Sequence, residues 1–126
     1  MRALTDRFTR ALHQLHADRD VAALVELFAE GATLSKLGDQ NEASGRDGAR
    51  RFWQEYRSVF NEIEASFTHT IAGQDSVALE WTSSGSLAGG RPFSYAGISV
   101  LVGDGTSITG FRTYYDSAAF VAPDTR

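Results

Sequence analysis

Hydrophobic residues recur every three or four positions in the first half of the chain, and this period predicts helices. The first helix carries its stripe near the N-terminus, at Leu4, Phe8, Leu12 and Leu15. A second helix is expected over residues 21–30, and a third, with the most aromatic face in the chain, over residues 47–60. Between these two helices, residues 32–35 are predicted as a short strand and the polar residues 38–45 as a loop.

After residue 60 the hydrophobic period changes from near 3.6 to 2, which predicts strands. Apolar and polar side chains alternate over residues 63–71, and a second strand is expected over residues 76–86. Residues 93–102 and 107–115 lie on either side of a Gly-Asp-Gly turn and predict a long hairpin. Three helices followed by a four-strand antiparallel meander is the element order of an α+β fold.

Composition and charge narrow the classes of function. The chain has 126 residues, the size of one domain, so residues 1–126 are expected to form a single unit. Its net charge of -4 argues against nucleic acid or an anionic membrane as the main partner. The chain has no cysteine, and no apolar run approaches the roughly 20 residues that cross a bilayer. Because the N-terminus lacks the apolar stretch of a signal peptide, a cytoplasmic location is expected.

Four segments give the chain a resemblance to a known family. They are DRDVAALVELFAEGATL (18–34), SGRDGARRFWQEY (44–56), GRPFSYAGISVL (90–101) and ITGFRTYYD (108–116). Together with the element order, they resemble the SnoaL-like branch of the nuclear transport factor 2-like superfamily, which includes polyketide cyclases, ketosteroid isomerases and limonene-epoxide hydrolase. The resemblance implies a cone-shaped fold, with three helices packed on a curved antiparallel sheet around a deep pocket. It also implies a dimer through the outer sheet face, as many members form.

The catalytic residues of these relatives are not matched in this chain. The positions that ketosteroid isomerases use for their general base and oxyanion donors hold Lys36, Leu12 and Ser99. The positions that limonene-epoxide hydrolase uses to activate water hold Ser83, Trp81 and Thr113. Because a carboxylate is needed to take the proton or to orient the water, neither known chemistry carries over.

Pairing the strands across their expected turns assigns side chains to the inner face of the sheet. The turns pair Phe67 with Trp81, Trp81 with Ser99, and Ser99 with Phe111, and directly paired residues share a face. With two residues of the third helix, this face predicts the ligand-binding wall of an apolar pocket: Trp53, Tyr56, Phe67, Trp81, Ser83, Tyr95, Ser99, Phe111, Thr113 and Tyr115. The tyrosines are either hydroxyl donors to a ligand carbonyl or core aromatics with their hydroxyls at the rim.

A few titratable residues are candidates for catalysis. His69 falls on the same inner face, where it is either a general base or a hydrogen-bonded core histidine. Lys36 is either a desolvated base or anion anchor, or a solvated lysine at the edge of a loop. Asp39 and Glu42 lie in the loop expected at the pocket mouth and are the carboxylates considered for catalysis. The histidine pair of the first helix has no paired carboxylate, so neither a metal nor another cofactor is expected.

Three hypotheses of function follow from these residues. The first is a domain that binds a small apolar molecule in an aromatic-lined pocket. The second is an acid–base isomerase, cyclase or hydrolase that acts on a polyketide-, steroid- or terpenoid-like substrate through His69, Lys36 or Asp39. The third is a non-catalytic protein-interaction module. The inner face favours the first hypothesis, because its aromatic and serine side chains outnumber its titratable ones.

The outer face of the sheet predicts a homodimer. Along residues 93–102 this face carries Ala96, Ile98, Val100 and Val102. Three helices whose apolar stripes point to one core cover only one face of the sheet. An apolar patch of this extent is usually buried against a partner, and a second copy of the same face closes it.

Overall fold

The computed structural model describes residues 1–36 and 42–120. Its helices are α1 (Arg2–Asp18), α2 (Ala22–Glu26), α3 (Gly45–Ser58) and the short 3-10 helix η1 (Ser117–Phe120). Its strands are β1 (Phe28–Lys36), β2 (Ala43–Ser44), β3 (Phe60–Ala72), β4 (Ser76–Leu87), β5 (Pro92–Gly103) and β6 (Ile108–Tyr115). The predicted α+β class, with its three helices, is confirmed.

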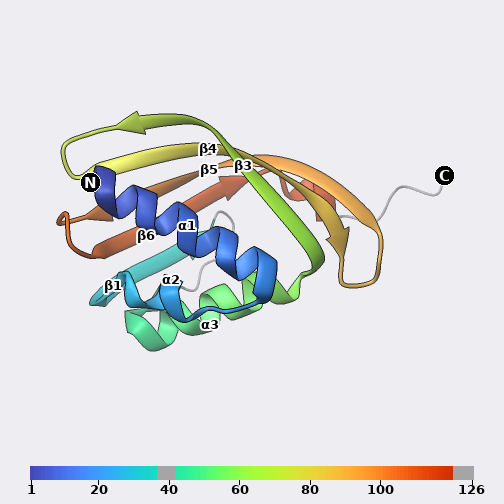
Figure 1. The fold of residues 1–126 in the computed structure, drawn as a ribbon, viewed down its shortest axis with the longest axis horizontal. Coiled ribbons are helices and arrows are strands. Elements are labelled where there is room, and N and C mark those ends of the chain that lie inside the picture. Colours follow the sequence, from blue (N-terminus) through green and yellow to red (C-terminus); the bar gives the residue numbers. More distant parts are fainter. Residues whose placement is uncertain (37–41, 121–126) are drawn as a thin grey trace.

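The strands form a six-stranded curved sheet, and the helices lie on its inner face (Figure 1). The strand order is β2-β1-β6-β5-β4-β3. Strands β3 to β6 form the antiparallel meander that the sequence predicts. Strand β1 lies beside β6 and runs parallel to it, so the sheet is mixed rather than wholly antiparallel.

The second helix is shorter, and the strand after it longer, than the sequence predicts. The helix was expected over residues 21–30, but α2 ends at Glu26 and β1 begins at Phe28. Phe28 pairs with Ile108 of β6, and the Ile108 backbone N–H donates to the oxygen of Leu27 at 2.7 Å. Pairing with a distant strand therefore overrides the helical period of this segment.

Two further boundaries differ from the expectation. Within the loop expected over residues 38–45, Ala43 and Ser44 form the short strand β2, which pairs antiparallel with β1. The third helix begins at Gly45 and ends at Ser58, so that Phe60, expected in the helix, starts β3. Residues 37–41 lie outside the part of the chain that the structure describes.

The core forms where α1 and α3 pack on the sheet. The predicted stripe of α1 is buried, and its Phe8 contacts Trp53 of α3 with ring centroids 6.0 Å apart. Trp53 also packs edge-on against Phe111 of β6 at 5.0 Å. These contacts hold the aromatic face of α3 above the inner side of the sheet.

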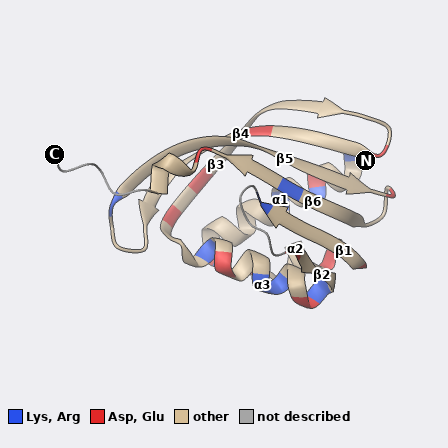
Figure 2. Cartoon of the chain, turned by 180° about the vertical axis from the view of Figure 1, so that it is seen from behind, with Lys and Arg blue, Asp and Glu red and all other residues tan. Residues whose placement is uncertain are grey.

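Charged residues are spread along α3 (Figure 2), and all of them are exposed except one. Arg57 is buried, and its guanidinium donates to the backbone oxygens of Leu15 at 3.2 Å and His16 at 3.1 Å, in the last turn of α1. It also donates to the oxygens of Phe60 at 2.9 Å and Asn61 at 3.3 Å, where β3 begins. Arg57 therefore ties the end of α1 to the junction of α3 and β3.

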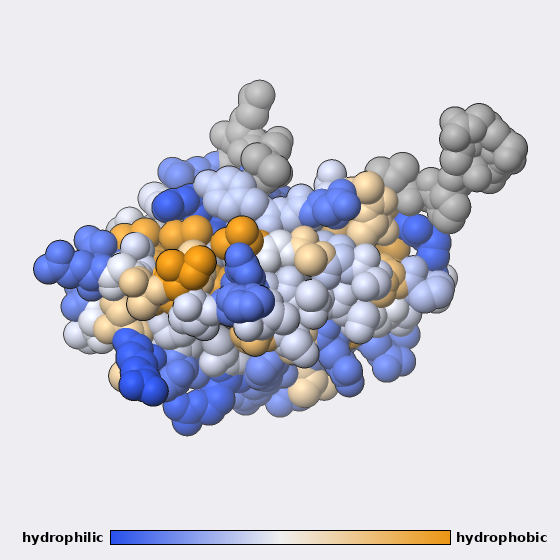
Figure 3. Space-filling view, turned by 90° about the horizontal axis from the view of Figure 1, so that it is seen from above, coloured by the Kyte–Doolittle hydropathy of each residue, from blue (hydrophilic) through white to orange (hydrophobic). Residues whose placement is uncertain are grey.

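Hydrophobic side chains also gather on the outer face of the sheet (Figure 3). Ile71, Ile98 and Tyr114 are 62%, 39% and 41% exposed, and Ile98 lies directly opposite Tyr114. No helix among the described residues is long and apolar enough to cross a membrane.

Candidate functional site

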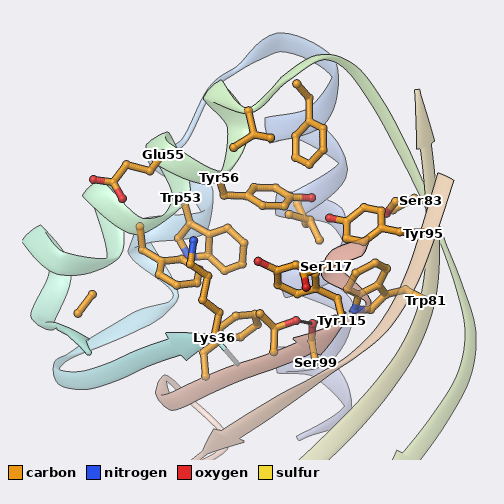
Figure 4. A pocket seen from close by; sticks show the side chains of 18 of the residues that line it. Lys36, Trp53, Glu55, Tyr56, Trp81, Ser83, Tyr95, Ser99, Tyr115 and Ser117 are labelled. Atoms are coloured by element: carbon orange, nitrogen blue, oxygen red, sulfur yellow. Dashed lines mark hydrogen bonds between the residues drawn. The ribbon is translucent and has the colours of Figure 1, made fainter. Parts of the chain in front are cut away.

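A cavity of about 800 Å³ lies between α3 and the inner face of the sheet (Figure 4). All of the side chains predicted for the pocket wall line it: Trp53, Tyr56, Phe67, Trp81, Ser83, Tyr95, Ser99, Phe111, Thr113 and Tyr115. That these side chains contact a ligand stays a prediction.

Other lining residues were missed by the sequence reasoning. Phe8 and Leu12 reach the cavity from α1, where their stripe had indicated only a core. Phe52 belongs to the aromatic face of α3, a signal that could have included it. Phe120 comes from η1, and its ring lies 4.8 Å from the ring of Tyr95. Phe120 lies in a short segment after the last strand, and this segment has no hydrophobic period, so no sequence pattern indicated it.

Strand register differs from the prediction by two residues at two of the three turns. Ser99 lies opposite Leu79 and Thr113, whereas Trp81 and Phe111 were expected there. A shift of two residues keeps every side chain on its face, because strand side chains alternate with period 2. The predicted wall therefore lines the cavity despite the wrong register.

His69 is the exception, and its predicted inner position is wrong. A bulge at Thr68 interrupts the pairing, so that Phe67 lies opposite Trp81 while His69 lies opposite Glu80. One extra residue turns the following side chains to the other face. His69 Nδ1 lies 3.0 Å from Glu80 Oε1 on the outer face, and the histidine side chain is 72% exposed. His69 does not line the cavity.

The other candidates for catalysis lie at the exposed edge of the cavity or outside the described residues. Lys36 is the last residue of β1, and it lines the cavity together with Glu42. Arg51 and Glu55 of α3 also line it, and all four side chains are exposed. Asp39 lies outside the residues that the structure describes. The charges of the described cavity wall are therefore at its rim.

Deeper in the cavity, a chain of hydrogen bonds joins three of the strands. The Trp81 indole N–H donates to Ser99 Oγ at 2.9 Å, and Ser99 Oγ lies 3.0 Å from Thr113 Oγ1. The Thr113 hydroxyl donates in turn to the oxygen of Ile98 at 3.4 Å. Because each hydroxyl has one proton, the Ser99 proton is then directed to Thr113.

Gly97 lets the Trp81 indole lie across β5. The two residues are directly opposite in the sheet. A Cβ at Gly97 would stand 2.6 Å from Trp81 Cζ2 and would also meet the backbone oxygen of Tyr114. Only glycine leaves room for the ring at this point of the wall.

Two tyrosine hydroxyls, those of Tyr56 and Tyr95, point toward one another (Figure 4). Burial, with a smaller contribution from Tyr95, raises the pKa of Tyr56 well above its ordinary value. Burial, with a smaller contribution from Tyr115, likewise raises the pKa of Tyr95. Both phenols therefore keep their protons at neutral pH and remain able to donate hydrogen bonds.

Behind Tyr56, on the side of α1, lies a histidine that the sequence reasoning had considered only as a weak metal ligand. His16 Nε2 is 2.6 Å from the Tyr56 hydroxyl oxygen. Burial lowers the pKa of His16 to about 4, with smaller contributions from His13 and Arg57. His16 is therefore neutral at neutral pH. Within residues 1–36 and 42–120, no three His, Asp or Glu side chains gather as a group that could hold a metal.

Solved structures with the same fold are numerous. An NTF2-like protein from Anabaena variabilis superimposes with a TM-score of 0.84 at 16% identity, over 93% of this chain and 90% of that one. A protein with a ketosteroid isomerase-like fold from Catenulispora acidiphila, in complex with trimethylamine, gives 0.79 at 21% identity, over 91% and 89%. TerC, co-crystallised with polyporic acid, gives 0.74 at 14% identity, over 93% and 95%. At these identities the likeness shows the fold alone.

The sequence itself identifies the family. A comparison with curated proteins found no match. The model of the SnoaL-like domain, however, matches residues 6–123, nearly the whole chain. The resemblance implied three helices packed on a curved sheet, and the structure has this arrangement, with a sheet that is mixed rather than wholly antiparallel. This chain belongs to the SnoaL-like domain family.

Proposed function

We propose that this chain binds an apolar small molecule that carries at least one acceptor oxygen. The observation that carries the proposal is the cavity of about 800 Å³, whose interior is aromatic and whose charged side chains lie at the rim. Ligand sites in proteins have volumes of roughly 300–1,000 Å³ and are mostly apolar with a few polar groups. The cavity has both properties.

The walls favour a flat or polycyclic molecule. Trp53, Phe67, Trp81 and Phe111 expose ring surfaces to the cavity from α3, β3, β4 and β6. Aromatic side chains contribute large apolar areas and prefer offset or edge-on contacts with other rings. A ligand with its own rings gains more from such walls than a flexible polar one.

The hydroxyls define the polar end of the ligand. Tyr56 and Tyr95 are neutral donors inside the cavity, whereas Ser99 is hydrogen-bonded to both Trp81 and Thr113. Neutral donors in an apolar site favour an acceptor such as a carbonyl or hydroxyl oxygen over a charged group, which would lose its hydration there. The complexes of two related folds with trimethylamine and polyporic acid support small-molecule binding.

Binding is better supported than acid–base catalysis. With His69 on the outer face, Lys36 and Glu42 are the remaining described candidates, and both are exposed at the rim. A general base must come within hydrogen-bond reach of the proton that it takes. A small ligand held against the tyrosines does not reach these exposed side chains. Only a ligand long enough to extend to the rim brings a proton within reach of Lys36 or Glu42, and the enzymatic alternative applies to such a ligand.

The proposal is tested by fluorescence titration with 1,4-naphthoquinone, a flat molecule with two acceptor oxygens. The chain has two tryptophans, Trp53 and Trp81, and both line the cavity, so quenching reports its occupancy. We expect saturable quenching of the wild type. Ala65→Phe, which places a large side chain in the cavity, should weaken the apparent affinity at least tenfold. Ser66→Phe, the neighbouring exposed position on the opposite face, is the control. Quenching that does not saturate, or that Ala65→Phe leaves unchanged, would contradict the proposal.

We also propose that the chain forms a homodimer through the outer face of the sheet. Exposed apolar side chains of β3, β5 and β6 lie on this face: Ile71, Ile98 and Tyr114, with Ile98 directly opposite Tyr114. Figure 3 shows that hydrophobic side chains gather on this face. None of the helices in the described part of the chain covers this face (Figure 1). A two-fold axis through Ile98 would place each patch on its copy and bury both.

A further inference from the structure

The pair formed by His16 and Tyr56 has an unusual feature. One ring nitrogen of His16, Nε2, lies 2.6 Å from the Tyr56 hydroxyl oxygen, but the other, Nδ1, is buried with no hydrogen-bond partner among the described residues. His16 is only 6% exposed. A neutral imidazole has one N–H and one lone pair, so the orphaned nitrogen carries either a proton or a lone pair.

The two tautomers have different costs. If Nδ1 carried the proton, a buried N–H donor would be left unsatisfied, a situation that folded proteins rarely contain. Arg57 adds to this cost, because its positive guanidinium donates to the backbone oxygen of His16 at 3.1 Å. A nearby positive charge favours a lone pair over an N–H at the orphaned nitrogen. The proton therefore belongs on Nε2.

This tautomer determines the direction of the bond to Tyr56. With its proton on Nε2, His16 donates to the hydroxyl oxygen of Tyr56. The Tyr56 proton then points elsewhere, and the hydroxyl of Tyr95 lies on that side, facing Tyr56 (Figure 4). A hydroxyl that accepts a hydrogen bond also becomes a better donor, because the two bonds polarise one another.

We propose that His16 is a positioning residue of the cavity: as the Nε2–H tautomer it donates to Tyr56 and so presents the Tyr56 proton to an acceptor oxygen of the bound molecule. The acceptor lies between Tyr56 and Tyr95. His16 itself does not line the cavity and acts through Tyr56. The inference rests on the proposed function, and it assigns the end of the cavity where the oxygen of the ligand binds.

The tautomer is tested on the wild-type protein by 15N NMR of the histidine side chains at pH 7, with His16→Gln to assign the signal. We expect a protonated Nε2 and an unprotonated Nδ1 at His16. A proton on Nδ1 would overturn the inference, because Tyr56 would then donate to His16 and have no proton for a ligand. The tautomer is read from the wild-type protein, and the variant serves only to assign the signal.

The direction of the bond to the ligand is tested with two probes of similar size. 2-Acetonaphthone has a carbonyl acceptor and 2-ethylnaphthalene has none. We expect the wild type to bind the ketone roughly 2- to 10-fold more tightly, the effect of one hydrogen bond, and to lower its carbonyl stretching frequency. Tyr56→Phe should reduce both the preference and the frequency shift, because Tyr95 is then the one of the two donors left beside the acceptor. Affinities are obtained by NMR titration, from the shifts of the two tryptophan indole N–H signals.

Variants of His16 separate positioning from a structural role. His16→Phe should reduce the carbonyl shift although Tyr56 is retained, and His16→Gln, which can still donate to Tyr56, should restore part of it. His13→Phe is the matched control, an exposed histidine one turn earlier on α1. Equal binding of the two probes with no carbonyl shift would overturn the inference and the acceptor oxygen assigned to the ligand, and it would leave the binding of an apolar molecule standing. Failure of both probes to bind the wild type would overturn the proposed function and the inference with it.

Discussion

The Trp81 indole donates a hydrogen bond to Ser99 Oγ at 2.9 Å, although the two residues are not opposite each other in the sheet. Trp81 lies opposite Gly97, and Ser99 lies opposite Leu79. The indole reaches diagonally along β5 because Gly97 has no side chain to stop it. Its N–H is thereby satisfied inside an otherwise apolar wall, and the ring is held in one orientation.

Ser99→Ala should lower the free energy of unfolding by about 1–3 kcal/mol, because it leaves the Trp81 N–H buried without an acceptor. Urea denaturation measures the change. Ser94→Ala, on the exposed face of the same strand, is the control and should have little effect. If the double variant Trp81→Phe/Ser99→Ala lost as much as the two single variants added together, the hydrogen bond would not be the cause.

Arg57→Met should destabilise the fold by about 2–4 kcal/mol, because it removes donors from buried oxygens of Leu15, His16 and Phe60. Arg50→Met, which removes an exposed arginine from the same helix, is the matched control. Thermal and urea unfolding of the two variants measure the difference. Equal stability of the two variants would contradict the role of Arg57 in tying α1 to the start of β3.

His16 should make the fold less stable in acid. Its pKa is about 4 in the folded protein and about 6.5 when unfolded, so the unfolded chain takes up the proton first as the pH falls. From pH 6.5 to about 4.5 this uptake should remove about 2–3 kcal/mol from the free energy of unfolding, and the loss should end below the folded pKa.

The measurement for this prediction is urea denaturation of the wild type and His16→Gln between about pH 4 and pH 7.5. Other groups titrate in both proteins, so the difference between them isolates His16. We expect the stability advantage of the wild type to shrink as the pH falls through this window. A difference that is constant with pH would mean that His16 titrates normally in the folded protein.

Ile98→Asp should convert the proposed dimer to a monomer, because it places a charge at the centre of the apolar outer face. Light scattering of the wild type and the variant at micromolar concentration measures the change. Thr109→Asp, at an exposed polar position near the start of β6, is the control. A wild type that is already monomeric at this concentration would contradict the dimer.

Sequence alone determined the helices and strands that follow from a hydrophobic period within one segment of the chain. The stripe of α1 follows from side chains that must be buried on one side. Strands β3 to β6 follow from their period-2 and β-branched patterns, and their observed ends lie within three residues of the predicted ones. The cavity wall was also accessible from sequence, because period 2 fixes which residues share a face even when the pairing is displaced by two.

Tertiary structure decided what depends on contacts between distant segments. Phe28 belongs to a strand because Ile108 pairs with it, although its local pattern is helical. His69 faces outward because one extra residue at Thr68 reverses the alternation, and no composition signal marks that bulge. His16 meets Tyr56 across forty positions of sequence. A period shows which side chains must be covered, whereas the partner that covers each one is chosen only when the whole chain packs.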